Sequence, residues 1–278
     1  MPDPLDTGPQ AAAIIGRDTD HYDWPELLGQ LNSLLRLRTT PIGMKMFERL
    51  TDLDQIERLR RPSNIHTTDQ IVGQACRNGW TVGVSAEDLV GAQCATVIGL
   101  HPRDENWLSG EHMAGVWFEN AAEAHLHQQA MDVVPFGRYE AMVVSPLSSE
   151  RLNPPDICLI YATPAQMIIF INGLQYSGYK KFDWSCVGES ACADSWGRAL
   201  ATGEPSLAIP CFAERRYGGV MEDELLMALP PHFLPKAIAG MQALARNGLR
   251  YPISPYGVSA DARAGMGVSY AGKSKTQS

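Results

Sequence analysis

The chain has 278 residues, a formal net charge of −8 and 19% charged residues. This length suffices for one large hydrophobic core or two smaller ones, and the acidic balance disfavours a nucleic-acid-binding protein, which needs a clustered basic face. No apolar stretch is long enough for a membrane helix, and residues 1–19 lack the basic start of a secretory signal. We therefore expect a cytoplasmic protein whose six cysteines stay reduced.

The first half of the chain shows alternating helical and strand-like patterns. A helix is predicted from the capping residue Asp23 to Leu35, because the leucines in this segment recur on one helical face. Pro41 ends that pattern, and a buried strand is predicted over 42–47. The further elements expected here are a helix over 68–78 stopped by Gly79, a strand over 80–84, helices over 87–99 and 113–131, and a strand over 139–145.

The second half continues the alternation. The predicted elements are strands over 157–161, 181–187 and 206–212, and helices over 164–175, 190–201, 223–228 and 234–246. Mixed helices and strands of this kind predict an α/β or α+β protein built of layered sheet and helices. We expect flexible tails at 1–20 and 259–278, which lack periodicity, around a single domain at 21–258 that is either one unit or two lobes, 21–150 and 151–258.

Two segments suggest an internal repeat. Residues 70–94 and 166–192 each run from a glutamine through a helix, a glycine stop and a strand to a cysteine, Cys94 or Cys192. If a strand–helix–strand–helix unit has been duplicated, these two cysteines are equivalent and face each other about a pseudo-two-fold axis. Chance similarity between two amphipathic units is the other interpretation.

The cysteines are the strongest chemical signal. No pair has the Cys-x-x-Cys spacing of a zinc ribbon or ferredoxin, and the strand-like surroundings of Cys158 and Cys186 predict core packing for these two. The other four lie beside small or polar residues, mostly near element ends, and are Cys76, Cys94, Cys192 and Cys211. Helix N-termini and nearby arginines favour the thiolate, which binds metals and attacks electrophiles. Three interpretations stay open: an iron–sulfur or zinc site, metal-free thiol chemistry, and four inert cysteines.

Other polar residues are candidates for the same site. Glu189, on the turn before Cys192, is the candidate general acid or base, and Lys45 is a candidate catalytic or anion-binding lysine within a strand-like run. The candidate ligands of an anionic substrate are Arg77, Arg215 and Arg216. A solvent-facing lysine and a solvated arginine loop are the alternative interpretations. No nucleophile elbow, P-loop, dinucleotide fingerprint or HExxH motif occurs, so the commonest hydrolase, kinase and nicotinamide-enzyme classes are disfavoured.

Several short motifs occur in a characteristic order. They are Pro41-Ile-Gly-Met-Lys45, Ala75-Cys-Arg77 with Gly79, Cys94-Ala-Thr-Val-Ile-Gly99, Pro154-Pro-Asp156, Pro164-Ala-Gln166, Ala191-Cys192, Pro210-Cys211 with Arg215, and Asp223-Glu-Leu225. In order and spacing the chain resembles the bacterial and archaeal family called domain of unknown function 169. The departures are Gly43 and the aromatic pair Phe182 and Trp184. The resemblance implies a shared fold and a shared site at the four matching cysteines, and it implies no reaction.

These observations predict a cysteine-centred enzyme. The leading hypothesis is an iron–sulfur or metal-dependent lyase or oxidoreductase that acts on a small anionic organic molecule, with Cys76, Cys94, Cys192 and Cys211 as metal ligands. One alternative is a metal-free thiol enzyme, and the other is an accessory protein that binds a ligand or partner without catalysis. We expect a small-molecule substrate, no nucleic-acid or membrane partner, and a homodimer on the frequency of such dimers among enzymes.

Overall fold

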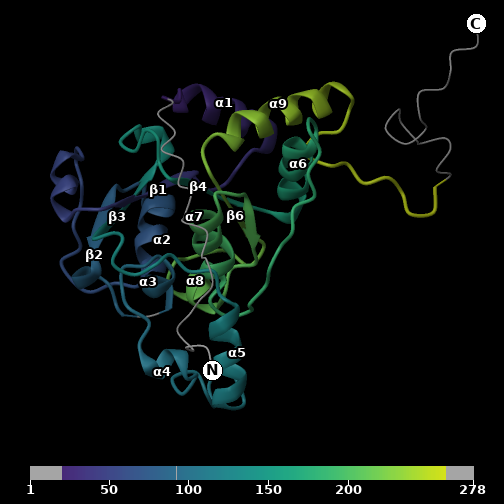
Figure 1. Ribbon diagram of the computed structural model, residues 1–278. Helices are drawn as coiled ribbons and strands as arrows, with labels where there is room; N and C mark the ends of the chain where they lie inside the picture. Colours follow the sequence, from purple (N-terminus) through teal and green to yellow (C-terminus); the bar gives the residue numbers. More distant parts are fainter. Residues whose placement is uncertain (1–20, 92, 261–278) are drawn as a thin grey trace, which may run out of the picture.

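A computed structural model describes residues 21–91 and 93–260, and the two predicted tails lie largely outside this part of the chain. Its centre is an antiparallel sheet whose described strands lie in the order β2-β3-β1-β4-β6-β5 (Figure 1). The strands are β1 (Ile42–Phe47), β2 (Val82–Ser85), β3 (Ala141–Pro146), β4 (Ile157–Ala162), β5 (Ser206–Ala208) and β6 (Leu225–Leu229).

Helices cover both faces of the sheet. The α-helices are α1 (Trp24–Leu35), α2 (Thr68–Asn78), α3 (Gln93–Val97), α4 (Glu105–Leu108), α5 (Ala121–Ala130), α6 (Pro164–Gln175), α7 (Arg198–Thr202), α8 (Phe212–Arg216) and α9 (Phe233–Arg246). Short 3₁₀ turns are η1 (Leu50–Gln55), η2 (Ala86–Asp88) and η3 (Leu147–Ser149), and η4 (Ala193–Gly197) is a π-helical turn. An antiparallel sheet layered between helices is an α+β fold, which confirms the predicted class.

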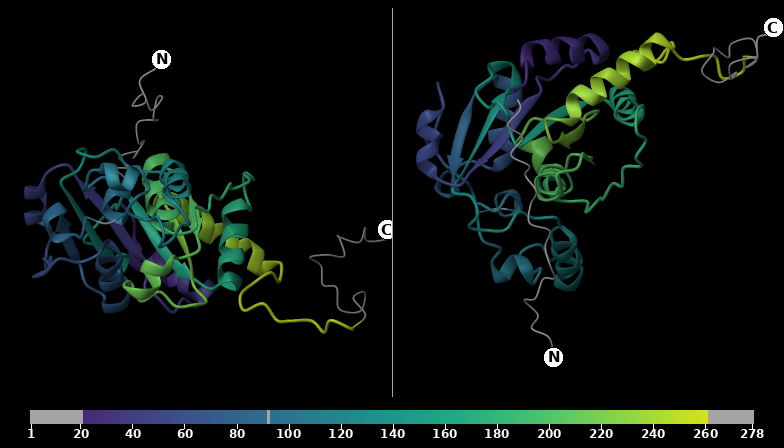
Figure 2. Two further views of the ribbon diagram at one scale, coloured as in Figure 1. Left: turned by 90° about the horizontal axis from the view of Figure 1, so that it is seen from below. Right: turned by 45° about the horizontal axis from the view of Figure 1, so that its top comes forward.

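Strand alternation separates two apolar cores. On β4, Leu159 and Tyr161 point into one core with residues of α2, α3 and η4, whereas Cys158 and Ile160 point into the other with residues of α1, α6 and α9. Figure 2 shows α1 and α9 side by side on the second face, and these helices are in contact. Because side chains alternate along each strand, both faces of the sheet are buried.

Most of the predicted elements are present. The structure confirms the helix of 68–78 at both ends, where Thr67 and Gln70 form a capping box and Gly79 adopts φ +72°. The strands over 42–47 and 157–161 and the helices over 164–175 and 234–246 are confirmed to within one residue.

The predicted helix over 223–228 is wrong, because this segment forms β6. Leucine, methionine and alanine favour helices, but the segment lies between β4 and β5, where Leu226 and Ala228 face one core and Met227 faces the other. Tertiary packing therefore overrides local propensity at this position.

The predicted strand over 181–187 is also wrong. This segment has no regular structure, and its Cys186 is exposed rather than packed in a core. Instead of strand pairing, the Asp194 carboxylate accepts hydrogen bonds from the Ser185 hydroxyl (2.7 Å) and the Val187 backbone amide (2.8 Å).

Three other predicted elements are shorter than expected. The helix over 113–131 begins only at Ala121, where the Asn120 side chain caps it, and the helix over 87–99 is limited to α3. The strand over 206–212 stops after Ala208, and α8 follows at Phe212. The helix over 190–201 is present with a π-helical turn inside it.

The predicted repeat has no structural counterpart in the helices. The corresponding helices α2 and α6 cover opposite faces of the sheet, and the second unit lacks its strand. β1, from the first predicted lobe, pairs directly with β4, from the second, so one continuous sheet contains strands of both.

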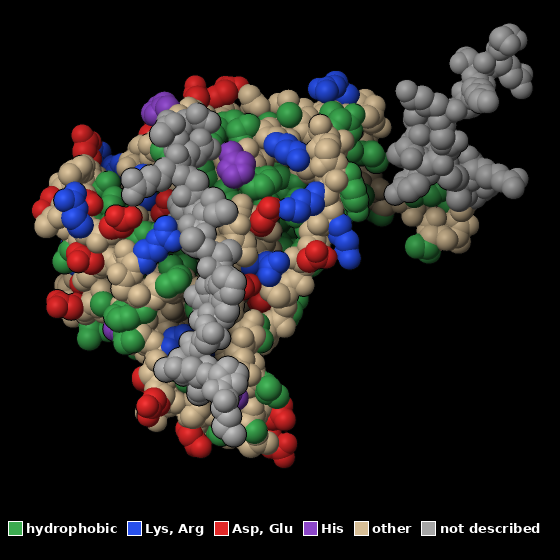
Figure 3. Space-filling view, viewed as in Figure 1, with side chains coloured by type: hydrophobic (Ala, Val, Ile, Leu, Met, Phe, Trp, Pro, Cys, Tyr) green, Lys and Arg blue, Asp and Glu red, His purple; other side chains and the backbone are tan. Residues whose placement is uncertain are grey.

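The surface carries charges of both signs. Figure 3 shows acidic and basic side chains interspersed on the face of the molecule that it displays. Within the described residues, the helices are all too short or too polar to cross a membrane.

Candidate functional site

The four singled-out cysteines come from four helices or helix starts. Cys76 lies in α2, Cys94 in the first turn of α3, Cys192 immediately before the π-helical turn η4, and Cys211 at the N-cap of α8. All four are buried. Because π-helical turns are rare and occur frequently at functional sites, the turn after Cys192 marks this region for closer inspection.

Cys94 is in contact with a carboxylate and a second thiol. Its Sγ atom donates to Asp69, at 3.6 Å from Oδ1 and 3.7 Å from Oδ2. The same thiol interacts with Cys192. Asp69 is the second residue of α2, whose first turn is fixed by the capping box. Three helical segments therefore bring together a thiol, a proton acceptor for it, and a second thiol.

Cys211 and Glu214 extend this group. They form a capping box at the start of α8, in which Glu214 Oε2 accepts a hydrogen bond from the Cys211 backbone amide at 3.1 Å. Ionisation of Cys211 acts electrostatically on Cys94, and ionisation of Glu214 acts on Cys192, so both lie close to the pair. The thiol–carboxyl cluster is defined here as Asp69, Cys94, Cys192, Cys211 and Glu214.

The surroundings of the cluster keep its thiols protonated. The interaction with Cys192 and burial raise the pKa of Cys94 well above its usual value. In Cys192 the interaction with Cys94 lowers the pKa, but burial and neighbouring carboxylates outweigh it, so the net shift is upward. Burial and Glu214 raise the pKa of Cys211 as well. A reaction of these thiols at neutral pH therefore requires a proton acceptor.

The two carboxyl groups of the cluster are also buried. Burial raises the pKa of Asp69 to about 6, and burial together with the Asp69 charge raises the pKa of Glu214 to about 8. At neutral pH, Asp69 is therefore mostly ionised and Glu214 mostly protonated. Asp69 is thus suited to accept the Cys94 proton.

The cluster has one nearby cation, Arg215, whose charge lowers the pKa of Glu214 without outweighing the effect of burial. In residues 21–91 and 93–260, no lysine or arginine side chain donates to any of its five members, and Glu214 Oε1 is buried without a hydrogen-bond partner. Five groups that can become anionic are therefore packed together, and this arrangement is favourable only while most of them keep their protons.

The Cys76 thiol forms its hydrogen bond outside the thiol–carboxyl cluster. This thiol donates to the Gly73 carbonyl of the same helix at 3.7 Å, and burial raises its pKa to about 11. The next residue, Arg77, forms an ion pair with the buried Glu224 and donates to the Thr39 hydroxyl at 2.8 Å. Arg77, predicted to bind an anionic substrate, is thus engaged within the protein.

The structure brings Glu189 to the cluster but not Lys45. The charge of Glu189 contributes to the raised pKa values of Asp69 and Cys211, and its backbone carbonyl accepts from His127 Nε2 at 2.8 Å. Lys45, by contrast, is paired with Val143 of β3, whose side chain faces away from the cysteine core, and its ammonium donates to the Pro154 carbonyl at 2.9 Å.

The guanidinium groups of Arg215 and Arg216 do not converge on one site. Arg215 donates to the backbone carbonyls of Pro210 (3.1 Å) and Met221 (2.6 Å), which fixes the loop around α8. Arg216 is exposed beside Tyr217. Of the predicted anion-binding arginines, only Arg216 is free of hydrogen bonds within the described chain.

Asp69 and Glu214 are the members that sequence reasoning missed. A signal for each is present in the sequence. Asp69 precedes Cys76 by seven residues, which places both on the buried side of one amphipathic helix, and Glu214 follows Cys211 at the spacing of a capping box.

The cysteines do not form a ready metal site in this structure. Among residues 21–91 and 93–260, no three His, Cys, Asp or Glu side chains are arranged to hold one metal ion. A metal at the cluster would therefore require its side chains to move.

Comparison with known proteins places the chain in a family. The family model DUF169, described as "Uncharacterised ArCR", matches residues 30–240. The chain belongs to this family. A relative from Methanocaldococcus jannaschii, "Uncharacterized protein MJ0308", is 23% identical over 126 residues, which are 44% of this chain and 54% of the relative. The chain thus matches about half the length of that curated relative. No solved structure gave a significant match.

Proposed function

We propose that this DUF169 protein is a cysteine-centred oxidoreductase in which Cys94 and Cys192 are the reacting thiol pair. One observation supports this proposal above the others: the Cys94 thiol contacts both the Asp69 carboxylate and a second thiol. Proton acceptor, nucleophile and resolving thiol are the groups that thiol–disulfide exchange requires.

The reaction proposed is exchange with a small organic disulfide. Cys94, which is 7% exposed whereas Cys192 is fully buried, transfers its proton to Asp69 and attacks one sulfur of the substrate. The leaving thiolate takes up a proton, and a mixed disulfide stays on Cys94. Cys192 then attacks the Cys94 sulfur and the second substrate thiol leaves with the Cys192 proton. One substrate disulfide and two protein thiols give two small thiols and one protein disulfide.

Oxidised glutathione is the probe for this reaction. After incubation of the native protein without oxygen, in a Cys186→Ser background that removes the exposed thiol, we expect the otherwise wild-type chain to lose two free thiols. Cys192→Ser should retain one glutathione on Cys94, because the resolving thiol is missing, and Cys94→Ser should lose no thiol at this site. Cys158→Ser, in the opposite core, is the matched control and should behave as the wild type. Unchanged thiol counts in the wild type contradict the proposal.

A second candidate is a thiophilic metal or iron–sulfur site at Cys94, Cys192 and Cys211. In the described residues, no lysine or arginine donates a hydrogen bond to these five acid-forming groups, and this favours the candidate, since a bound cation would release their protons. The lack of preformed ligand geometry weighs against it. Iron, sulfide and zinc analysis of anaerobically purified protein separates the two candidates. A metal-free, colourless protein with unreactive thiols would favour the accessory protein without catalysis.

A further inference from the structure

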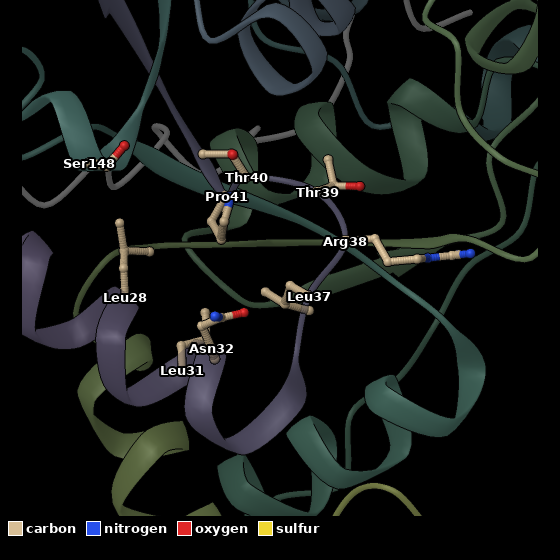
Figure 4. Close-up of a pocket in the computed structure, with 9 residues that line it drawn as sticks. All are labelled: Leu28, Leu31, Asn32, Leu37, Arg38, Thr39, Thr40, Pro41 and Ser148. Atoms are coloured by element: carbon tan, nitrogen blue, oxygen red, sulfur yellow. The ribbon is translucent and has the colours of Figure 1, made fainter.

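The reacting thiols proposed above are largely closed off from solvent. Cys94 is 7% exposed, Cys211 6% and Cys192 0%. The pocket of about 320 Å³ between α1, the connection to β1 and η3 is not their entrance, because none of its described lining residues belongs to the thiol–carboxyl cluster (Figure 4). Attack on a disulfide requires access to the attacking sulfur, so part of the chain has to move before a substrate reaches the pair.

Residues 183–189, called the strap here, lie beside the cluster. They have no regular secondary structure and end the long connection that leaves α6 and runs toward α5 and α8 (Figure 1). The side chain of Val187 packs against the apolar core that contains the reacting pair. Glu189 lies close to the cluster, since its charge acts on Asp69 and Cys211. The strap therefore covers the cluster on one side.

Three hydrogen bonds join the strap to the rest of the described chain. The Asp194 carboxylate accepts two of them, from the Ser185 hydroxyl at 2.7 Å and from the Val187 amide at 2.8 Å. His127 Nε2 of α5 donates the third, to the Glu189 carbonyl at 2.8 Å. Asp194 lies in the π-helical turn η4, which begins directly after the resolving cysteine. A segment held by so few bonds opens at a lower free energy than the strands of the sheet.

The backbone is bent at the end of the strap. Gly188 has φ +83°, and Ser190 has φ +67° and is buried. The left-handed region is open to glycine but unfavourable for serine, and a serine stays there only where its surroundings enforce it. Release of the strap would let Ser190 leave this conformation, which favours opening at this point.

We propose that the strap is a gate over the thiol pair, and that Asp194 and His127 are positioning residues that hold it closed. This inference rests on the proposed function, since the gate supplies the route by which a disulfide reaches Cys94. Opening breaks three hydrogen bonds and the packing of Val187, while the sheet stays folded. The thiol pair therefore becomes accessible by local opening rather than by global unfolding.

Alkylation of the folded, reduced chain by iodoacetamide tests the gate without any disulfide exchange. Digestion and mass spectrometry follow the initial rate at each cysteine, in the Cys186→Ser background that removes the exposed thiol. Cys158 is fully buried in the opposite core, so its rate reports global unfolding in the same sample. We expect Cys94 to be alkylated at least about tenfold faster than Cys158.

Variants of the strap and its anchors give the decisive comparison. Ser185→Ala removes one hydrogen bond to Asp194 and should speed the alkylation of Cys94 about threefold or more, with Cys158 unchanged. His127→Phe keeps a ring but removes the bond to Glu189, and it should act in the same direction. Ser177→Ala, at an exposed position on the same connection, is the matched control and should change neither rate.

The inference is overturned if Ser185→Ala and His127→Phe leave the Cys94 rate unchanged, or if they raise the rates of Cys94 and Cys158 equally. Ser185→Ala alone is decisive if His127→Phe does not fold. The gate and the proposed function fail in different ways. Faster alkylation in Ser185→Ala without exchange with oxidised glutathione would keep the gate and contradict the thiol reaction, whereas exchange with unchanged alkylation rates would contradict the gate alone.

Discussion

The Asp69 carboxylate and the Cys94 thiol meet inside a core with little access to water, and this placement determines their chemistry. Desolvation raises the pKa of Asp69, and the interaction with Cys192 together with desolvation raises the pKa of Cys94. The thiol is therefore not ionised in advance, and the carboxylate is a better base than an exposed aspartate. Reactivity at Cys94 therefore depends on its neighbour rather than on a low pKa of its own.

Replacing Asp69 with asparagine tests this dependence. Asp69→Asn keeps the size of the side chain but removes the proton acceptor, so the rate of Cys94 modification by oxidised glutathione should fall about a hundredfold. The rate is followed by mass spectrometry of the intact protein. Asp54→Asn, at an exposed position in η1, is the control. An unchanged rate in Asp69→Asn would show that Asp69 has no role in proton transfer.

Glu214 should make the stability of the protein depend on pH. Its folded-state pKa, about 8, lies above the ordinary value of 4.5, so the folded chain holds a proton that the unfolded chain has lost between these values. Stability from this group is therefore fully present below pH ~4.5 and is lost as the pH rises through ~8. The glutamine in Glu214→Gln cannot ionise, so this variant should not lose stability in this way. From pH 4 to pH 9, its free energy of unfolding relative to wild type should rise by on the order of several kcal/mol.

Urea unfolding of the two proteins across this pH range measures the effect. Glu222→Gln, at an exposed position eight residues along the chain, should keep the wild-type pH dependence. If Glu214→Gln and wild type lose stability in parallel as the pH rises, the buried protonated carboxyl is ruled out.

Among the elements, α6 and α9 approach unusually closely. A Cβ atom added at Gly240 of α9 would lie 2.0 Å from the Gly173 carbonyl oxygen of α6, and one added at Gly173 would lie 2.5 Å from the Ala237 carbonyl oxygen. Both contacts involve backbone atoms, which cannot turn aside as a side chain can. Glycine is required at this crossing because the backbones themselves are in contact.

Gly240→Ala should therefore force the two helices apart. We expect a loss of about 2 kcal/mol or more in the free energy of unfolding, measured in urea. Gly29→Ala in α1 is the matched control, since an added Cβ there meets nothing within 4 Å, and it should stabilise the protein by about 0.5–1 kcal/mol. Equal effects of the two substitutions would contradict the close crossing.

At the scale of the whole molecule, one ion pair links distant segments. Arg77 of α2 pairs with Glu224, which precedes β6, and both bond to the Thr39 hydroxyl on the connection before β1. The side chain of Glu224 is only 1% exposed. The network therefore links α2 to the chain segments that precede β1 and β6, and the arginine balances a buried charge.

Arg77→Met should leave that carboxylate without a partner. Removal of one member of a buried pair costs about 3 kcal/mol or more. Urea unfolding should show this loss, whereas Arg216→Met, at an exposed position, should change the stability by less than about 0.5 kcal/mol. A loss below about 1 kcal/mol in Arg77→Met would show that the pair contributes little to holding the segments together.

The helices and strands of this protein can be predicted from its sequence better than the residues of the thiol–carboxyl cluster. Both ends of α2 can be predicted because its capping box and terminal glycine are local signals, which do not depend on the rest of the fold. The sequence predicts a helix where β6 forms, because the strand character of this segment comes only from its neighbours β4 and β5. Asp69 was missed for a related reason, since its contact with Cys94 joins residues 25 positions apart and exists only after folding.

The most direct test of the central claim is to map the disulfide formed in the native wild-type protein after oxidation by oxidised glutathione. Trapping free thiols with N-ethylmaleimide, followed by digestion without reduction and mass spectrometry, identifies the joined peptides. The account predicts one main linkage, between the Cys94 peptide and the Cys192 peptide, with Cys158 alkylated after unfolding. Linkage of other cysteines, or alkylation of both Cys94 and Cys192 after full exposure to the oxidant, would contradict a reacting pair at this site.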